Sequence, residues 1–205
     1  MILLHPTYFP SIVQMVVVAK AEKLVFEVED NYQKQTYRNR AYIAHANGRL
    51  TLNVPIKHSK DGTRQKYKEV VVENSFPWQS QHWKSLQSAY RTSPFFEFYE
   101  DDLAPLFKTK VDYLLDFNFK IFDTLSDLIG IELPYSTTSE YVKNPKEKDL
   151  RYLAIAKNEP EYSLVKYNQV LQENHGFLPN LSVLDLLFNE GPNTLSYLEE
   201  QKIEF

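Results

Sequence analysis

Cysteine is absent from this chain of 205 residues, and glycine occurs only five times. The lack of cysteine excludes disulfide bonds, thiolate metal sites and a cysteine nucleophile. It is typical of proteins in a reducing compartment, so we expect a cytoplasmic protein. The scarcity of glycine argues against a large glycine-lined dinucleotide site, and the sequence contains no phosphate-loop or nucleophile-elbow motif.

Long apolar runs and metal-ligand patterns are missing as well. The apolar stretches near the N-terminus fall far short of the roughly 20 residues of a membrane-spanning helix, and no basic segment precedes them as in a signal peptide. Four histidines show no metal-ligand spacing. They are His45, His58, His82 and His175. We therefore expect no membrane insertion, no metal and no cofactor.

Apolar residues are plentiful enough for an ordinary core, because 43% of the chain is hydrophobic and 14% is aromatic. The length fits a single domain over residues 1–205, with a strand-rich part over 1–75 and a mainly helical part over 76–205. Whether the chain forms homo-oligomers stays open at this point.

Positive charge is concentrated in one stretch, although the formal net charge of the chain is −4. Residues 34–68 contain nine Lys or Arg and one acid, Asp61, which leaves −12 for the rest of the chain. Such a local excess favours an anionic ligand carrying phosphate or carboxylate. A solvated basic loop is an equally good interpretation. Nucleic acid is not an expected partner, because the chain is acidic overall and shows no known nucleic-acid-binding motif.

The first 30 residues have the pattern of a strand, a helix and a second strand. Residues 1–5 predict a short buried strand that ends at a proline-containing turn, Ser11 can cap a helix over 11–23, and residues 24–29 alternate as a strand does. A βαβ unit of this length predicts two neighbouring parallel strands, as at the start of a Rossmann-like nucleotide-binding fold.

Later segments complete the predicted fold class. Residues 49–56 and 67–73 alternate and predict a hairpin, with a turn at Asp61–Gly62 in the loop between them. A helix is predicted from Pro77 to Pro94. The chain is therefore expected to be α/β, a parallel or mixed sheet with flanking helices and a helical C-terminal half.

Three further expectations concern the middle of the chain. Helical spacing continues over residues 102–129 and stops at Gly130. Residues 131–135 predict one more strand of the sheet. Residues 139–175 are polar and predict loops or a short helical excursion.

The last helix is the most sharply bounded element. Ser182 or Asn180 can accept a hydrogen bond from a first-turn amide, and Asp185 follows Ser182 as the acid of a capping box. The helix is apolar nearly all round, so we expect Leu184 and Leu187 to be buried.

His5 stands at the carboxyl end of the first predicted strand, where ligands bind in open α/β sheets. The turn that contains Pro6 and Tyr8 leads into a predicted helix N-terminus, whose amides suit an anion. His5 is therefore a candidate general acid or base, with Pro6 and Tyr8 as ligand contacts. The alternative interpretations are a hydrogen-bonded turn histidine and a tyrosine that fills the core.

A polar segment follows the second predicted strand and should lie near His5 at the same edge of the sheet. Its candidate ligand residues are Tyr32, Lys34, Asn39 and Arg40. They offer an aromatic platform, a point charge, an amide and a planar guanidinium, a set that can hold a nucleotide or a phosphosugar.

Four motifs, in this order along most of the chain, resemble the WbqC-like family. They are His5-Pro6-Thr7-Tyr8-Phe9-Pro10; Tyr32-x-Lys34-x-x-Tyr37-x-Asn39-Arg40; Leu52-x-Val54-Pro55-Ile56; and the C-terminal signature Phe177-Leu-Pro-Asn180-Leu-Ser182-Val-Leu-Asp185-Leu-Leu-Phe188-Asn-Glu-Gly191-Pro192. The resemblance implies a bacterial transferase that moves an acyl or amino-acyl group, such as glycyl, to an amino sugar in surface-polysaccharide or O-antigen biosynthesis. It also implies an anionic small-molecule partner: a nucleotide, a nucleotide sugar or an acyl donor.

A non-catalytic binding or assembly protein that keeps the family fold is the alternative, and three departures from the family pattern favour it. Members usually begin the first motif with Gln-Pro, where this chain has His5-Pro6. Val28 and Glu29 stand where an aspartate pair is common. Residues 139–175 are short and glycine-poor for the section that usually precedes the final signature.

Overall fold

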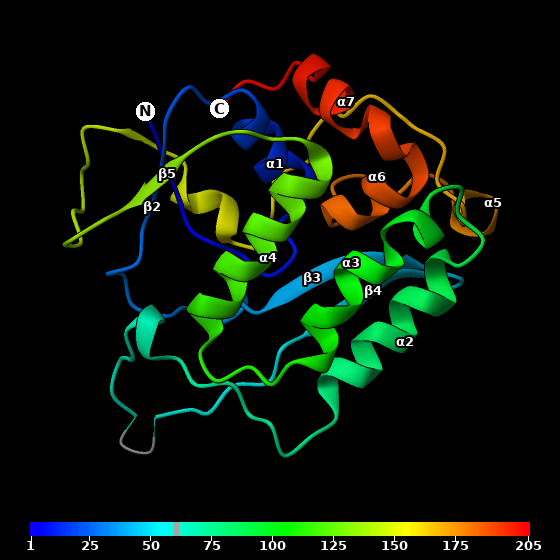
Figure 1. Cartoon of the computed structure of the whole chain (residues 1–205). Helices are drawn as coiled ribbons and strands as arrows, with labels where there is room; N and C mark the ends of the chain where they lie inside the picture. The colour runs from blue at the N-terminus through cyan, green and yellow to red at the C-terminus, as the bar shows by residue number, and fades with distance from the viewer. Residues whose placement is uncertain (60–61) are drawn as a thin grey trace.

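Four short parallel strands form a sheet beside the N-terminus in the computed structural model, which describes residues 1–59 and 62–205 (Figure 1). The strand order is β5-β2-β1-β6. Ile2 lies opposite Leu24 in the β1–β2 pair, which confirms the predicted parallel neighbours. The strands are β1 (Ile2–Leu4), β2 (Leu24–Phe26), β5 (Tyr135–Thr137) and β6 (Lys148–Asp149).

Helix α1 (Ile12–Ala19) crosses from β1 to β2. It begins where predicted, because the Ser11 hydroxyl accepts a hydrogen bond from the amide of Gln14. It ends before the predicted limit at Lys23, whose carbonyl instead accepts from the amide of Ile2. All but the last residue of α1 are buried, as its nearly uniform apolar sequence requires.

A separate antiparallel hairpin is built from β3 (Arg40–His45) and β4 (Gly48–Asn53). The predicted hairpin of residues 49–56 with residues 67–73 is therefore wrong for most of its length, and the two segments are joined by an isolated antiparallel bridge between Ile56 and Val72. The signal this prediction overlooked is Asn47-Gly48, a dipeptide typical of tight hairpin turns, in which Gly48 adopts a φ of 107°. The predicted turn at Asp61 lies outside the described residues.

Residues 67–73 do not form a strand. A 3-10 turn covers Tyr67–Glu69, and the following residues make isolated bridges, one of which joins Val72 to Ile56. The phenol of Tyr67 is completely buried and donates to the carbonyl of Pro6, so the turn is held against the N-terminal segment.

Two helices replace the single helix predicted over residues 102–129. Helix α3 ends at Lys108, and α4 begins at Leu114, whose amide donates to the carbonyl of Val70. The break escapes a periodicity analysis because both helices bury one apolar face. Gly130 ends α4 as predicted, with a φ of 84°. The three central helices are α2 (Trp78–Tyr90), which confirms the helix predicted after Pro77, α3 (Phe96–Lys108) and α4 (Leu114–Ile129).

The region after α4 is more ordered than its composition indicates. Strand β5 starts at Tyr135, the last residue of the strand predicted over 131–135. Residues 139–175, predicted as loops or a helical excursion, contain β6, a 3-10 turn over Arg151–Ala154 and the short helix α5 (Gln172–His175).

The C-terminal segment folds into α6 (Val183–Glu190) and α7 (Thr194–Glu200). Leu184 and Leu187 are completely buried, as predicted, and the Ser182 hydroxyl accepts from the amide of Leu184. Asp185 is not a capping acid. Its carboxylate is completely buried and accepts from the phenols of Tyr90 and Tyr167, because α6 packs with its first turn inside the core.

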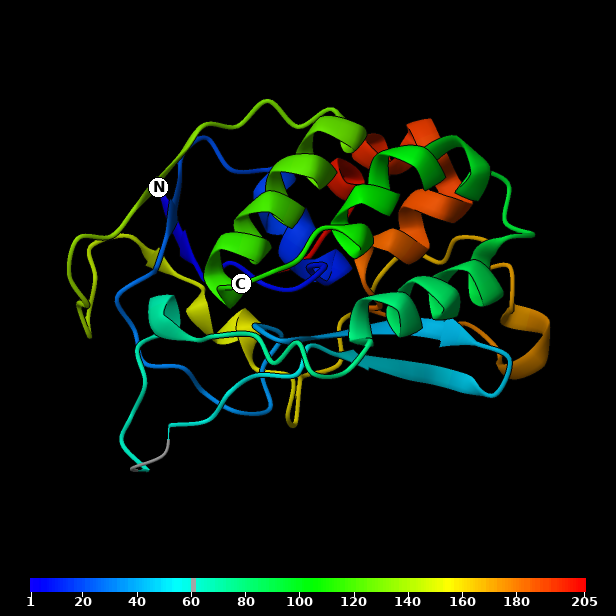
Figure 2. The same cartoon turned by 60° about the horizontal axis from the view of Figure 1, so that its bottom comes forward.

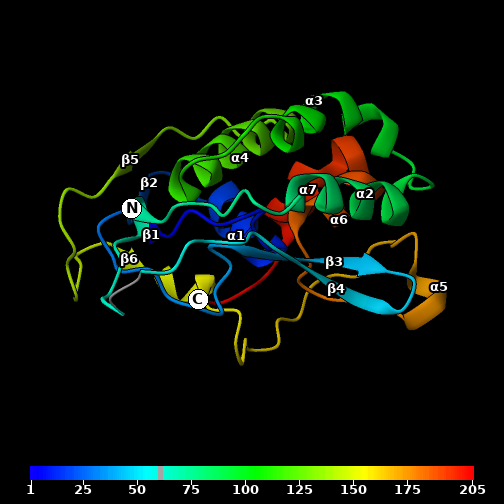
Figure 3. The ribbon, with the colours of Figure 1, turned by 90° about the horizontal axis from the view of Figure 1, so that it is seen from below.

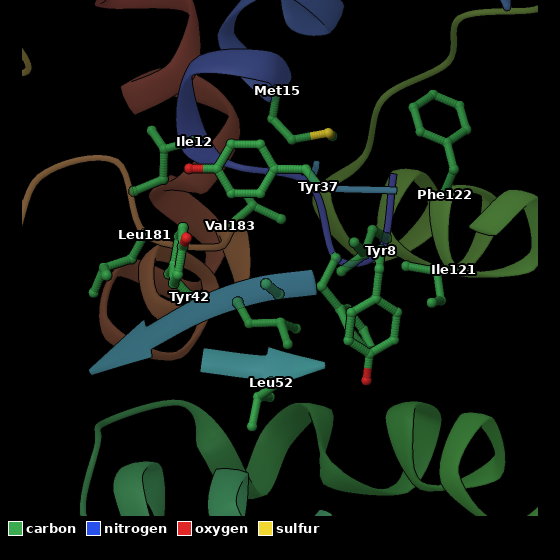
Figure 4. Close-up of a cluster of buried hydrophobic side chains, with 14 of the residues drawn as sticks. Tyr8, Ile12, Met15, Tyr37, Tyr42, Leu52, Ile121, Phe122, Leu181 and Val183 are labelled. Carbon is green, nitrogen blue, oxygen red and sulfur yellow. The ribbon is translucent and has the colours of Figure 1, made fainter. Parts of the chain in front are cut away.

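The hairpin and the helices enclose a common core. Figures 2 and 3 show β3 and β4 on one side of α2 and α6, and β3 contacts both helices. Figure 4 shows side chains from α1, the hairpin, α4 and the segment before α6 meeting in this core, among them Ile12, Leu52 and Leu181. Within residues 1–59 and 62–205, no helix combines the length and apolar character that crossing a membrane requires.

Candidate functional site

Charged residues gather where the parallel strands end. His5 follows β1 directly, Asp30 lies in the turn after β2, and Asp149 is the last residue of β6. β2 lies on one side of β1 and β6 on the other, so the strand order changes direction beside β1. Open α/β sheets bind their ligands at such a position, outside the carboxyl ends of the strands.

His5 is held by two charged neighbours at this edge. Arg38 Nη2 donates a hydrogen bond of 2.7 Å to His5 Nε2 and another of 3.0 Å to Asp30 Oδ2. The side chain of His5 is only 3% exposed. Burial, together with the charge of Arg38 and against the hydrogen bond with Asp30, lowers the pKa of His5 to about 4. His5 is therefore uncharged at neutral pH, with Nε2 as an acceptor.

Arg38 and Asp30 form a largely buried ion pair. Arg38 is 1% exposed, and burial lowers its pKa while the neighbouring Tyr67 and Asp30 partly restore it. Burial raises the pKa of Asp30, but the hydrogen bond and charge of His5 and the charge of Arg38 outweigh it, so the net pKa is lowered. Asp30 is thus a carboxylate at neutral pH and Arg38 is its counter-ion.

Asn118 of α4 and Tyr67 hold the backbone around Arg38 and His5 in place. Asn118 Nδ2 donates to the carbonyl of Arg38 over 2.7 Å and to the phenol oxygen of Tyr67. The Tyr67 phenol in turn donates to the carbonyl of Pro6 over 2.8 Å, and its ring lies 5.4 Å from the guanidinium of Arg38. The backbone on both sides of the His5–Arg38 contact is therefore anchored to the core.

A second arginine, Arg151, stands at the end of β6. It makes a two-point contact with Asp149, through Nε at 2.9 Å and Nη2 at 2.7 Å, and its Nη1 donates to the buried Glu27 over 3.2 Å. The guanidinium also lies 5.0 Å from the ring centre of Tyr141. The hydrogen bonds and charge of Asp149 raise the pKa of Arg151.

These groups line a cavity of about 290 Å³, here called the His5 cavity. Its charged lining residues are the buried Arg38 and Arg151, the partly buried Asp30, and the exposed Lys143 and Asp149. Three lining residues with large apolar side chains, Tyr141, Tyr152 and Ile155, are exposed as well. The remaining lining residues are His5 and Gln33.

The N-terminus of α1 is not available to an anion, so that part of the sequence prediction is wrong. Its amides are already hydrogen-bonded: Ile12 donates to the carbonyl of Leu181, Val13 to the side-chain oxygen of Asn180, and Gln14 to Ser11. The segment before α6 occupies the place where an anion would bind.

The residues predicted for the site fall into three places. His5 lines the His5 cavity, whereas Pro6 and Tyr8 are buried beneath it. Tyr8 is completely buried, its phenol hydrogen-bonds to His82 Nδ1 over 2.8 Å, and Figure 4 shows it among core side chains that include Ile121.

Tyr32, Lys34, Asn39 and Arg40 line a different cavity of about 490 Å³, here called the Arg40 cavity. The two cavities share no lining residue. Tyr32 is near an arginine of each cavity. Burial raises the pKa of Tyr32 to about 12, and the nearby charges of Arg38 and Arg40 each oppose this rise. The other lining residues are Gln35, Asn53, Val54, Pro55, Ile56, His58, Glu73 and Phe76.

Sequence reasoning missed most of the charged groups around His5. They are Glu27, Asp30, Arg38, Asp149 and Arg151. Arg38 lies inside the segment chosen for its polarity, but strand alternation would put it on the same face as Arg40, so no sequence signal separated the two. Asp149 and Arg151 become visible only once β6 is known to be a parallel strand, and its two residues are too few to show any period.

The arrangement supports proton transfer and anion binding better than metal chemistry. Among the described residues, no cluster of three or more His, Cys, Asp or Glu side chains is placed to hold a metal ion. An uncharged histidine can accept a proton from a bound ligand, and guanidinium groups bind phosphate or carboxylate.

Comparison with known proteins gives one family and one relative. The WbqC-like protein family matches residues 5–165. A protein of Mycobacterium tuberculosis (strain ATCC 25618 / H37Rv), named Uncharacterized protein Rv1507c, is 26% identical over 210 residues, which cover 88% of this chain and 89% of that protein. No solved structure matches the chain.

Proposed function

Because this chain belongs to the WbqC-like protein family, we propose that it is a transferase that moves an acyl or amino-acyl group, such as glycyl, from an activated donor to an amino sugar. The donor is an anionic, nucleotide-like compound such as an acyl-adenylate, and the acceptor belongs to the synthesis of a surface polysaccharide such as O-antigen. The lack of cysteine fits a reaction in the cytoplasm.

The observation that carries this proposal is the uncharged His5 between Arg38 and the charged end of β6. In the proposed reaction the amine nitrogen attacks the acyl carbonyl carbon, the new amide bond forms, and the bond to the phosphate leaving group breaks. His5 takes the proton that the amine loses on Nε2, which is unprotonated beforehand and gives up its hydrogen bond from Arg38 in this step. Lys143 and Arg151 face the leaving phosphate.

A ligand screen followed by one conservative variant tests the proposal. Thermal shift with nucleotides, nucleotide sugars and acyl-adenylates should identify a ligand, because saturation at about 100 times the dissociation constant adds roughly 2.7 kcal/mol to the stability. Turnover is then measured for His5→Gln, whose side-chain oxygen can still accept from Arg38 but which cannot take a proton. His45→Gln, outside the cavity, is the matched control.

We expect His5→Gln to bind the donor like the unmodified chain and to lose turnover about 100-fold or more, the usual contribution of a general base. His45→Gln should retain turnover. If His5→Gln turns over at the normal rate, His5 only positions Arg38 and the proposed proton transfer is wrong.

A non-catalytic binding protein is the second candidate, and a specific observation favours it. Both arginines of the His5 cavity already have carboxylate partners, Arg38 in Asp30 and Arg151 in Asp149. Arginines compensated in this way stabilise the charge that develops on a leaving phosphate less than unpaired arginines would, which argues against catalysis at this site. A ligand that binds tightly while donor and amino-sugar acceptor together give no product would favour this candidate.

A further inference from the structure

The Arg40 cavity differs from the His5 cavity in its charge balance. Across residues 1–59 and 62–205, neither Lys34 nor Arg40 forms an ion pair. The one acid in the lining, Glu73, accepts from the amide of Ser75 in its own turn. Within the described residues, Lys34 and Arg40 therefore have no carboxylate as an ion-pair partner, in contrast to the arginines near His5.

Part of the lining of the Arg40 cavity is apolar. Val54, Pro55 and Ile56 continue the line of β4, and the ring of Phe76 is 62% exposed at the edge. An exposed aromatic ring beside unpaired cations suits a ligand with one apolar ring face and one anionic substituent.

Two polar atoms in this lining lack a hydrogen-bond partner within the described part of the chain. Asn39 Nδ2 donates to the carbonyl of Val54 over 3.0 Å, which fixes the amide, whereas Asn39 Oδ1 finds no partner there. The buried Arg40 Nε finds none among the same residues. A movement of the Arg40 side chain would open both atoms to a hydroxyl donor and an anionic acceptor, while the Asn39 amide stays fixed by Val54.

We propose that the Arg40 cavity is a second ligand site, which binds a sugar that carries a carboxylate or phosphate group. The anion lies on Lys34 and Arg40, a ring hydroxyl donates to Asn39, and one ring face packs on Phe76. The cavity of about 490 Å³ has room for a monosaccharide. This binding is separate from the His5 cavity and does not depend on the transfer reaction.

Calorimetric titration with four simple probes tests the assignment. Glucose 6-phosphate and glucuronate supply a ring with an anion, glucose supplies the ring alone, and inorganic phosphate supplies the anion alone. We expect at least one of the two acidic sugars to bind at millimolar concentration or below, and about tenfold more tightly than either glucose or phosphate. Equal affinity for inorganic phosphate, or no heat with either acidic sugar, would overturn the proposal.

Three variants locate the binding. Lys34→Gln with Arg40→Gln should weaken it about tenfold or more, since both charged contacts are lost. Lys84→Gln with Arg91→Gln removes the same charge from exposed positions of α2 and its C-terminus and should leave affinity unchanged. His5→Gln should also leave it unchanged, which separates this site from the proposed reaction.

Phe76→Ala gives a second test in case the charge variant misfolds. Phe76 is exposed, so its replacement leaves no cavity in the core. It should weaken the acidic sugar about threefold or more and leave inorganic phosphate unaffected, a factor in keeping with one lost ring contact. If neither Phe76→Ala nor the Lys34→Gln, Arg40→Gln double substitution changes the affinity for the acidic sugar, the sugar binds elsewhere and the proposal is wrong.

Discussion

The side chain of Asn180 closes the helix that follows His5: its Oδ1 accepts a hydrogen bond of 2.9 Å from the amide of Val13. Asn180 Nδ2 also donates to Glu159 over 2.7 Å. Residues far apart in sequence thus share one helix terminus, and the C-terminal segment fixes the turn that carries His5.

Replacing Asn180 by alanine should lower the free energy of unfolding by roughly 1–3 kcal/mol, because it removes a hydrogen bond at the N-terminus of α1 and leaves an alanine at a φ of 49°. Chemical denaturation measures the change. Asn193→Ala is the control, because Asn193 precedes α7 without a side-chain cap bond and should change stability by no more than a few tenths of a kcal/mol. Equal effects of the two substitutions would mean that the Asn180 bond contributes nothing.

The titration of His5 should respond in opposite directions to its two neighbours. Asp30→Asn removes a carboxylate that favours the protonated ring, so the pKa of His5 should fall below about 4. Arg38→Gln removes a nearby positive charge, so the pKa should rise. The His5 ring resonances in NMR spectra recorded against pH give both shifts, and shifts of the same sign would contradict the described contacts.

Two buried histidines predict a loss of stability in mild acid. Burial lowers the pKa of both His5 and His82 from 6.5 to about 4. Between these values the unfolded chain binds more protons than the native one, so stability falls as the pH drops from 6.5 toward 4 and is unaffected by these groups above 6.5. Each histidine accounts for roughly 3 kcal/mol of this fall.

The His82 share can be isolated by comparing denaturation curves at pH 7 and pH 4. His82→Gln should lose roughly 3 kcal/mol less than the unmodified chain over this interval, since glutamine does not titrate. His45→Gln should follow the unmodified chain. An identical pH dependence for His82→Gln would show that the ring is not held in its neutral form.

How much the sequence reveals depends on the range of the interactions involved. The β1–α1–β2 unit was predictable because its signals are local, from the apolar run before His5 to the cap at Ser11. The pairing of β3 with β4 was predictable in principle from Asn47-Gly48. The contacts of Arg151 with Glu27 and of Asn180 with Val13 were not, because each depends on a partner more than 100 residues away along the chain.

The candidate site shows the same limit. Its position at the carboxyl end of β1 follows from the order of elements and was expected from His5. Its division into two cavities follows from side-chain directions along the segment after β2, where Arg38 turns toward His5 and Arg40 turns away. Irregular backbone has no fixed period. Composition alone therefore predicted Lys34 and Arg40 beside His5, whereas they line the other cavity.

Gly191 should be intolerant of any side chain. Its φ of 53° combines with a ψ of −120°, and a Cβ there would lie 2.5 Å from the ring of Phe95. Gly191→Ala should therefore cost roughly 2–6 kcal/mol, from backbone strain and overpacking together. Gly130→Ala is the control, because a Cβ at Gly130 meets nothing within 4 Å and only the left-handed backbone, about 1–2 kcal/mol, opposes it. If Gly191→Ala and Gly130→Ala lower the free energy of unfolding equally in chemical denaturation, the ring of Phe95 moves aside without cost and the predicted overpacking is wrong.

The leucines of α6 decide whether this helix is core or a mobile cover. Leu184 and Leu187 are completely buried, so truncating either to alanine should cost about 2–5 kcal/mol through lost burial and a residual cavity. Ser182→Ala should cost only about 1 kcal/mol, because it removes one capping hydrogen bond. A cover that spends time in solvent would behave differently, since its leucines would already be partly hydrated. Chemical denaturation of the three variants separates the two descriptions. A loss under roughly 0.5 kcal/mol for both leucines, far below the range for core truncations, would contradict the packed helix.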